Sequence, residues 1–345
     1  MDELKRLISD LCGICTVTGS EADADESVLP VQSFDRYEKD RLGNRFFYRY
    51  SKKENAPMMV IDAHFDEVGF IVTEILENGF VRSVKAGSPD MRAVSASTVT
   101  IYGKEPVFAV ATSTPPHLRT GTDNSVVREN ELMFDTGLSE ARARELIRPG
   151  DRVCFSKRAR DLKNGRFMAQ GLDNKACAAI ALYSAVSVPA DEMEYSVCVL
   201  LSSGEEGGCM CAVPASKSVK PDLTVVLDAG FGRNGLSDTP RCIAMGKGPA
   251  ISYSSALDRA LTEKIIMTAS DNSLPLQVIV ENFAPGTNSE FIQHFSGVPS
   301  ALISLPLFNM HSSSEIISIP DAHAASDLIA KLIRTPDLAA GGEKQ

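Results

Sequence analysis

The order of apolar and polar positions divides the chain into three parts. In the first and last parts, apolar runs rich in β-branched residues predict buried strands at residues 57–63, 196–201 and 223–232. Apolar positions at helical spacing predict helices at residues 2–12 and 321–333. Strands alternating with helices are typical of an α/β fold, so we expect a mixed, largely parallel sheet flanked by helices.

The middle part, residues 69–160, has a different pattern. Short alternating runs end at turn sequences such as Asn78-Gly79, which predicts a small β-barrel or sandwich. The α/β pattern continues on both sides, and the chain is longer than a single core usually supports. We therefore interpret residues 69–160 as an inserted β-rich domain, a barrel or a sandwich, within a discontinuous domain of residues 1–68 and 161–345.

Candidate metal ligands and catalytic acids follow the apolar strands where those strands end. His64 and Asp66 follow the first strand, and Glu205 and Glu206 follow the second. The apolar stretch of the third ends on Asp228. Ligands of open α/β sheets bind beyond the carboxyl ends of the strands, so we expect these side chains to converge. In the Glu205-Glu206 pair, one carboxylate can bind a metal ion while the other exchanges a proton with water.

Two more candidates complete the set. Asp173 lies at the start of an alanine-rich helix, and His311 follows a strand expected at residues 300–305. Together, two imidazoles and three carboxylates suit two zinc-like ions that share one bridging carboxylate. Each residue alone also fits a structural role, such as helix capping for Asp173 or a surface position for His64. Their joint placement at strand ends and helix starts favours a metal site.

Composition and charge argue against several classes of partner. The net charge of −10 and the pI near 5.1 argue against nucleic acid, which needs a basic surface. No run approaches the roughly 20 apolar residues of a membrane span, and the N-terminus lacks the apolar core of a signal peptide. The eight scattered cysteines suit a reducing cytoplasm. Cys12-Gly-Ile-Cys15 has the spacing of zinc and redox sites, but without a second such pair we expect packing at a helix end.

Short motifs along nearly the whole chain resemble the glutamyl/TET aminopeptidases, dinuclear metallopeptidases that remove amino acids from peptide N-termini. Their order and spacing carry the resemblance, which implies a zinc-peptidase-like fold with an inserted β-barrel. The motifs are Leu42-Gly-Asn44, Ala63-His-Phe-Asp-Glu-Val-Gly69, Thr114-Pro-Pro-His117, Gly171-Leu-Asp-Asn-Lys175, Gly204-Glu-Glu206, Leu227-Asp228 and His311-Ser-Ser-Ser-Glu315.

The resemblance also implies which residues bind metal. One ion would be bound by His64 and Asp228, the other by Glu206 and His311, and Asp173 would bridge them. The cofactors would be two divalent ions per subunit, with zinc as the first expectation and cobalt or manganese as alternatives.

Further roles follow from the same resemblance. Asp66 would orient His64, and Glu205 would be the general base that activates a metal-bridging water. The chain departs from the pattern at Asn288, where relatives commonly have an acid, and we expect this to affect substrate preference more than metal binding.

Three hypotheses for function follow. The leading one is a cytoplasmic aminopeptidase acting on short peptides. The same metals could instead serve another amide hydrolase, of the N-acyl or carboxypeptidase type, which a requirement for a free α-amine would distinguish. A non-catalytic scaffold of the same fold predicts a lost ligand or base, yet all the candidate residues are present. Because relatives dimerise through the inserted domain and assemble into a hollow tetrahedral dodecamer, we also expect a homo-oligomer.

Overall fold

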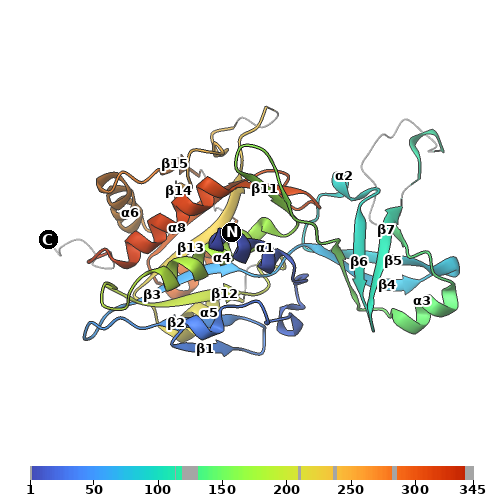
Figure 1. Ribbon diagram of the computed structural model, residues 1–345, viewed down its shortest axis with the longest axis horizontal. Helices are drawn as coiled ribbons and strands as arrows, with labels where there is room; N and C mark the ends of the chain where they lie inside the picture. The colour runs from blue at the N-terminus through green and yellow to red at the C-terminus, as the bar shows by residue number, and fades with distance from the viewer. Residues whose placement is uncertain are drawn as a thin grey trace.

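The computed structural model describes residues 2–112, 114–118, 131–208, 211–235, 239–281 and 286–338. These residues form a large α/β body and a smaller β-barrel that projects from one side of it (Figure 1). Among them, no helix combines the length and the apolar character needed to cross a membrane.

The large body is built on a mixed sheet, which has eight strands within the described ranges, in the order β1-β2-β12-β3-β13-β16-β14-β15. The central strands β12, β3, β13 and β16 are parallel, whereas β2 and β14 join them in antiparallel pairs. Apolar runs fill the central strands because both of their faces are buried. The strands are β1 (Arg36–Lys39), β2 (Arg45–Arg49), β3 (Met58–His64), β12 (Ser196–Ser202), β13 (Leu223–Phe231), β14 (Ala250–Tyr253), β15 (Gln277–Val280) and β16 (Ser300–Leu307).

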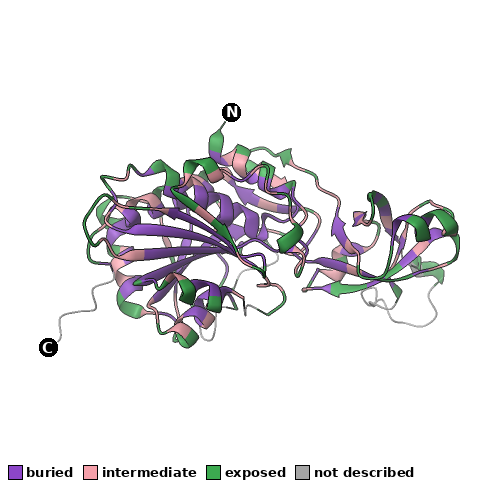
Figure 2. Ribbon diagram, turned by 90° about the horizontal axis from the view of Figure 1, so that it is seen from below, coloured by how far each residue is buried: buried purple, intermediate pink, exposed green. Residues whose placement is uncertain are grey.

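Helices cover both faces of this sheet, and Figure 2 shows its strands as buried between them. Successive residues of β3 point to opposite faces: Ile61 packs in the main core with α1, α4, α6 and α8, whereas Val60 packs with Ala215 of α5. On this second face α7 lies against α5. The helices are α1 (Glu3–Cys12), α4 (Leu172–Ser187), α5 (Ala212–Val219), α6 (Arg259–Asp271), α7 (Asn288–Ser296) and α8 (Ile319–Ile333).

The smaller body is a closed antiparallel barrel whose described strands follow the order β4-β5-β8-β7-β6-β9. Its interior is apolar, and the ring of Phe70 meets Phe134 and Phe155 edge to face at centroid distances of 5.3 and 5.9 Å. The elements of this segment are β4 (Gly69–Ile75), β5 (Phe80–Ala86), α2 (Met91–Val94), β6 (Thr98–Tyr102), β7 (Pro106–Thr112), β8 (Met133–Asp135), α3 (Glu140–Leu146) and β9 (Arg152–Phe155).

A small antiparallel sheet leads the chain from the barrel back to the large body. It consists of β10 (Arg160–Asp161), β11 (Arg166–Ala169) and β17 (Glu315–Ser318). Because β11 pairs with β17 so that Ala169 lies opposite Glu315, the start of α4 lies beside the loop at residues 311–315.

The predicted mixed α/β fold with an inserted β-barrel is confirmed, and two local expectations at candidate site residues are wrong. Strand β13 continues to Phe231, because β16 pairs with it over that length, so Asp228 lies within the strand and not at its end. The N-cap of α4 is Gly171, with a φ of 75°, and not Asp173, which like Asn174 has non-helical dihedral angles inside the first turn. Glycine adopts this left-handed conformation without a steric penalty.

Candidate active site

The carboxyl ends of β3 and β12 bring the first candidate residues together. The two strands are parallel with Ser202 opposite His64, so the loop after β12 lies beside the end of β3. The buried carboxylate of Asp66 accepts hydrogen bonds from the backbone N–H groups of Glu205, at 3.1 Å, and Glu206, at 3.0 Å. Asp66 therefore fixes the backbone of both neighbouring glutamates.

His64 has acidic groups on both sides of its buried ring. Its Nδ1 lies 3.1 Å from the backbone oxygen of Asp66 and 3.4 Å from Oδ1 of the same residue. Its Nε2 lies 3.2 Å from Asp173 and 3.5 Å from Asp228. A carbonyl oxygen only accepts hydrogen bonds, so the neutral ring carries its proton on Nδ1 and presents the Nε2 lone pair to the carboxylates. A metal-binding histidine has this arrangement.

His311 repeats the arrangement from the opposite side. Its Nδ1 lies 2.8 Å from the backbone oxygen of Ser88, in the barrel segment, and its Nε2 lies 3.1 Å from Oε1 of Glu206. Nε2 also lies 3.5 Å from Oδ2 of Asp173. The neutral ring therefore presents Nε2 to a second pair of carboxylates.

Asp173 lies between the two imidazoles. It directs Oδ1 to His64 and Oδ2 to His311. The first turn of α4 is held in place by Asn174, whose side-chain amide donates to the backbone oxygen of Leu227 at 2.9 Å. A fixed carboxylate with one oxygen on each side is suited to bridging two cations.

Glu315 is a buried site residue to which the sequence analysis assigned no role, although it ends one of the quoted motifs. Its Oε1 accepts from the backbone N–H of His311 at 2.8 Å, and its Oε2 accepts from that of Asp173 at 3.1 Å. Burial raises the pKa of Glu315 to about 8, and the charge of Asp173 acts in the same direction. The motif that it shares with His311 was the available signal, but a motif alone does not give the role of each residue in it.

The electrostatics of the cluster favour a bound cation. Burial raises the pKa values of the Glu206 and Asp228 carboxyls. Burial lowers the pKa of His311, but hydrogen bonds to Asp173 and Glu206 outweigh it and raise that pKa to about 11. Ligand atoms of His64, Asp173 and Glu206 all lie within 4.8 Å of one another. This mixed nitrogen and oxygen set fits a divalent metal ion.

Asn288 lies beneath the cluster and not in the adjoining cavity. Its amide donates to Oδ2 of buried Asp62 at 3.0 Å and to the hydroxyl of Ser202 at 2.9 Å. Both partners belong to the strands that carry His64 and the glutamate pair. These hydrogen bonds place Asn288 among the residues that support the ligands, and its effect on substrate preference stays a prediction.

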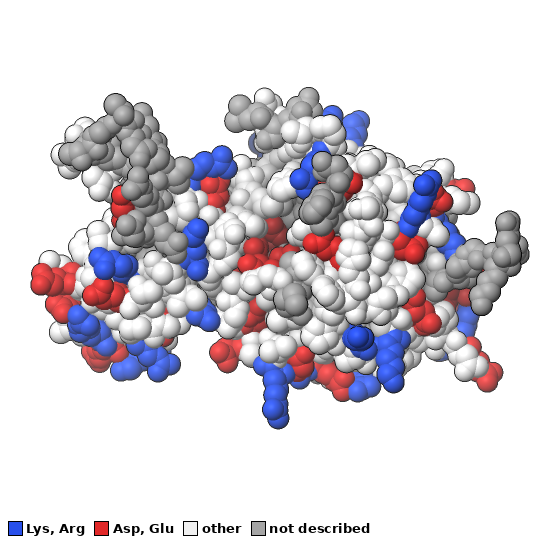
Figure 3. Space-filling view, turned by 180° about the vertical axis from the view of Figure 1, so that it is seen from behind, with Lys and Arg blue, Asp and Glu red and all other residues white. Residues whose placement is uncertain are grey.

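A cavity of about 1630 Å³ opens beside His311 and is lined in part by Phe231, Phe308, Met310 and Arg241. Figure 3 shows acidic side chains gathered near the middle of one face, where the barrel meets the large body. A space of this size beside the candidate metal ligands has room for a peptide chain end.

Comparisons with known proteins find relatives over most of the chain. A family model for the M42 glutamyl aminopeptidases matches residues 43–328. Lysyl aminopeptidase of Pyrococcus furiosus is 25% identical over 307 residues, which are 87% of each protein. Glutamyl aminopeptidase of Lactococcus lactis is 26% identical over 309 residues, which are 86% of this chain and 85% of the relative.

Solved structures share the fold. The TET1 peptidase of Pyrococcus horikoshii can assemble into a tetrahedron or a large octahedral shell. It is 25% identical to this chain with a TM-score of 0.84, and the match covers 96% of this chain and 99% of the TET1 chain. A TET aminopeptidase from a marine sediment Thaumarchaeota archaeon is 24% identical with a TM-score of 0.89, covering 96% of both chains. Because the family model spans most of the sequence, the chain belongs to the M42 glutamyl aminopeptidase family and is a metal-dependent peptidase.

Proposed function

We propose that the protein is an aminopeptidase that uses two divalent metal ions to release N-terminal residues from short peptides. The position of Asp173 carries the proposal, because its two carboxylate oxygens face two imidazoles that are each oriented through Nδ1. Relatives named lysyl and glutamyl aminopeptidase support the choice of reaction.

Each proposed ligand has an assigned ion. His64 and Asp228 would hold one ion, Glu206 and His311 the other, and Asp173 both. Zinc is the first expectation, with cobalt or manganese as alternatives. When bound, such ions polarise the scissile carbonyl and lower the pKa of the attacking water.

Glu205 is proposed as the general base. Its Oε2 lies 3.9 Å from Nε2 of His64, and its own backbone N–H donates to Oδ1 of Asp66, which holds the backbone in place. A carboxylate at this place accepts the proton of the attacking water and then delivers it to the leaving nitrogen of the peptide. The proposal assigns Glu205 to neither ion, so its carboxylate keeps a lone pair for this transfer.

A panel of aminoacyl p-nitroanilides tests the reaction type. The metal-loaded protein should hydrolyse substrates with a free α-amine and not their N-acetylated counterparts, and chelation should abolish the activity. Hydrolysis of the N-acetylated compounds at equal rates would favour the alternative amide hydrolase. Complete inactivity with zinc, cobalt and manganese would favour the scaffold.

The assembly and the location belong to the same proposal. We expect a homo-oligomer built on dimers, with a tetrahedral dodecamer as the specific case, since TET1 of Pyrococcus horikoshii forms a tetrahedron. The barrel offers exposed apolar side chains such as Phe108 and Val84 for such contacts. A cytoplasmic location is proposed because the cysteines are scattered along the chain, which suits a reducing compartment. Light scattering tests the assembly, and a fully active monomer would overturn it.

A further inference from the structure

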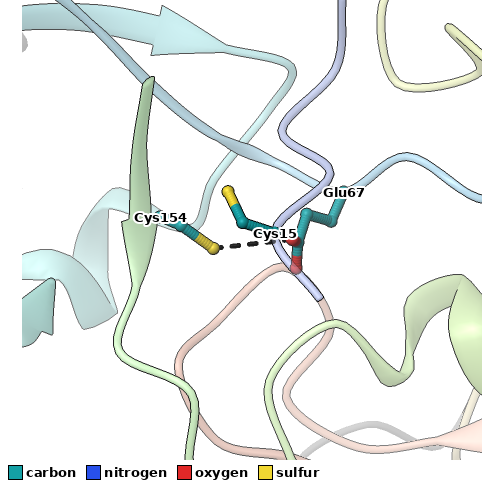
Figure 4. A group of neighbouring side chains, drawn as sticks. All are labelled: Cys15, Glu67 and Cys154. Carbon is teal, nitrogen blue, oxygen red and sulfur yellow. Dashed lines mark hydrogen bonds between the residues drawn. The ribbon is translucent and has the colours of Figure 1, made fainter. Parts of the chain in front are cut away.

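A second cluster of reactive side chains lies at the junction of the barrel and the large body, apart from the proposed metal ligands. Figure 4 shows its core, in which Cys15 follows α1, Glu67 follows β3, and Cys154 belongs to barrel strand β9. Two cysteines far apart in the sequence therefore face each other across the junction.

The two thiols are close but differ in access. One ligand atom from each of Cys15, Cys154 and Glu67 lies within 4.8 Å of the others, and a disulfide joins its sulfur atoms at about 2.05 Å. Cys154 is fully buried and donates to Oε1 of Glu67 at 3.5 Å. Cys15 is partly exposed and lines a cavity of about 680 Å³ with Tyr102 and Arg152. A small reagent in this cavity reaches Cys15 first.

The surroundings also favour Cys15 as the nucleophile. The pKa of the Cys15 thiol is lowered, because its interaction with the Cys154 thiol and the nearby charge of Lys157 outweigh burial and the charge of Glu67, which act in the opposite direction. Burial raises the pKa of the Cys154 thiol well above its usual range. The thiolate is the reactive form of cysteine.

A metal ion fits this cluster poorly, although two thiols and a carboxylate are possible ligands. The Lys157 ammonium lies 2.7 and 2.6 Å from the two oxygens of Glu67, and the Lys175 ammonium lies 2.9 Å from Oε1. Gln170 donates to Oε2 at 2.5 Å, and the backbone N–H of Thr16 donates to Oε1 at 2.8 Å. Glu67 is thus occupied by donors, and two ammonium groups repel an added cation.

We propose that Cys15 and Cys154 are a modification site, at which hydrogen peroxide converts the thiol pair into a disulfide. The Cys15 thiolate attacks a peroxide oxygen, so that an S–O bond forms, the O–O bond breaks, and the leaving hydroxide takes up a proton to become water. The Cys154 sulfur then attacks the Cys15 sulfur, the S–S bond forms, and the S–O bond breaks. The departing hydroxide takes the Cys154 proton. The two sulfurs lose two electrons, and one peroxide becomes two waters.

The disulfide ties two parts of the fold together. Residue 15 belongs to the N-terminal segment of the large body, and Cys154 lies in the last strand of the barrel. The bond therefore fixes the barrel to the large body at their junction, and thiol reductants reverse it.

Peroxide treatment of the intact, metal-loaded protein tests the proposal. After treatment, the protein is denatured, its remaining thiols are alkylated, and its peptides are mapped by mass spectrometry. We expect one cross-linked peptide joining Cys15 to Cys154, two fewer alkylated thiols, and full reversal by dithiothreitol. In Cys154→Ser, dimedone should trap a sulfenic acid on Cys15.

Cys12 provides the matched control. It stands in the Cys12-Gly-Ile-Cys15 motif, but it packs in the main core and burial raises its pKa to about 12. Cys12→Ser should leave the cross-link unchanged. A Cys12 to Cys15 disulfide, or a Cys15 that stays reduced while other thiols oxidise, would overturn the proposal. So would cadmium binding, seen as thiolate-to-metal absorption that Cys15→Ser removes, in a protein that forms no cross-link.

Discussion

The Nδ1–H of His311 donates to the backbone carbonyl of Ser88 across 2.8 Å, and this bond connects the inserted barrel with the candidate metal site. The connection is doubled, because the backbone N–H of Asp90 donates to the carbonyl of His311 at 2.9 Å. The barrel segment contributes none of the proposed side-chain ligands, yet it determines the orientation of one imidazole. The loop between β5 and α2 is therefore part of the site's support.

Gly87→Ala should disturb this support. Gly87 has a φ of +73°, and a Cβ there would lie 3.0 Å from Val68 and 3.3 Å from the Cβ of Glu206. Strain and crowding should displace the loop, lowering metal affinity by about 10–100-fold, as loss of outer-shell support typically does. Metal competition with a chromogenic chelator measures the affinity.

The matched control is Gly137→Ala. Gly137 has a similar φ of +66°, but a Cβ there meets nothing within 4 Å. The Gly137→Ala substitution imposes a similar backbone strain in the barrel segment without contacting the metal site. If both variants lost metal equally, the effect would come from general destabilisation and not from contact with Glu206.

Turnover should require two ions per subunit. Dialysis against a chelator should abolish activity, and back-titration with zinc or cobalt should restore it with a break near two equivalents, because the ligand set divides into two groups around Asp173. Elemental analysis of the restored protein gives the stoichiometry. Full activity at one equivalent would contradict the dinuclear site.

The neighbours Glu205 and Glu206 should give different phenotypes. Glu205→Gln should keep both ions and lose about 10²–10⁴-fold in kcat, the usual contribution of a general base. Glu206→Gln should lose metal, because its carboxylate faces Nε2 of His311. Metal content and kcat are measured on the same preparations, and an exchange of the two phenotypes would reverse the assignment.

Strong local patterns in the sequence predicted the site residues that follow buried strands. His64 was predictable because a continuous apolar strand ends on it, and the same holds for the glutamates after β12. The contact with the carbonyl of Ser88 was not predictable, since every residue has a backbone carbonyl and the residue type does not show which one is used. The short edge strand β1 is largely exposed, so it lacks the apolar pattern of a buried strand. The approach of Cys15 to Cys154 depends on how the barrel sits on the large body, which no local pattern encodes.

Glu67 should be among the most important residues for stability. It is 1% exposed and contacts the ammonium groups of Lys157 and Lys175. Glu67→Gln leaves both charges buried without a counter-ion, which typically costs about 3–5 kcal/mol. The control Glu38→Gln breaks an exposed ion pair with Arg36 and should leave the free energy of unfolding nearly unchanged. Urea unfolding at fixed protein concentration measures both, and equal small losses would contradict the role of Glu67.

The difference in free energy of unfolding between wild type and Glu67→Gln should depend on pH in a defined direction. Burial raises the pKa of Glu67, but the charges of Lys157 and Lys175 outweigh it and lower that pKa from 4.5 to about 2. Between these values the unfolded chain binds more protons at this residue than the folded protein does, so the stability from Glu67 falls as pH falls. In metal-free protein, the difference between wild type and Glu67→Gln should be constant above pH 4.5 and shrink towards pH 2. A difference that grew on acidification would show that the carboxylate is not held ionised by the two lysines.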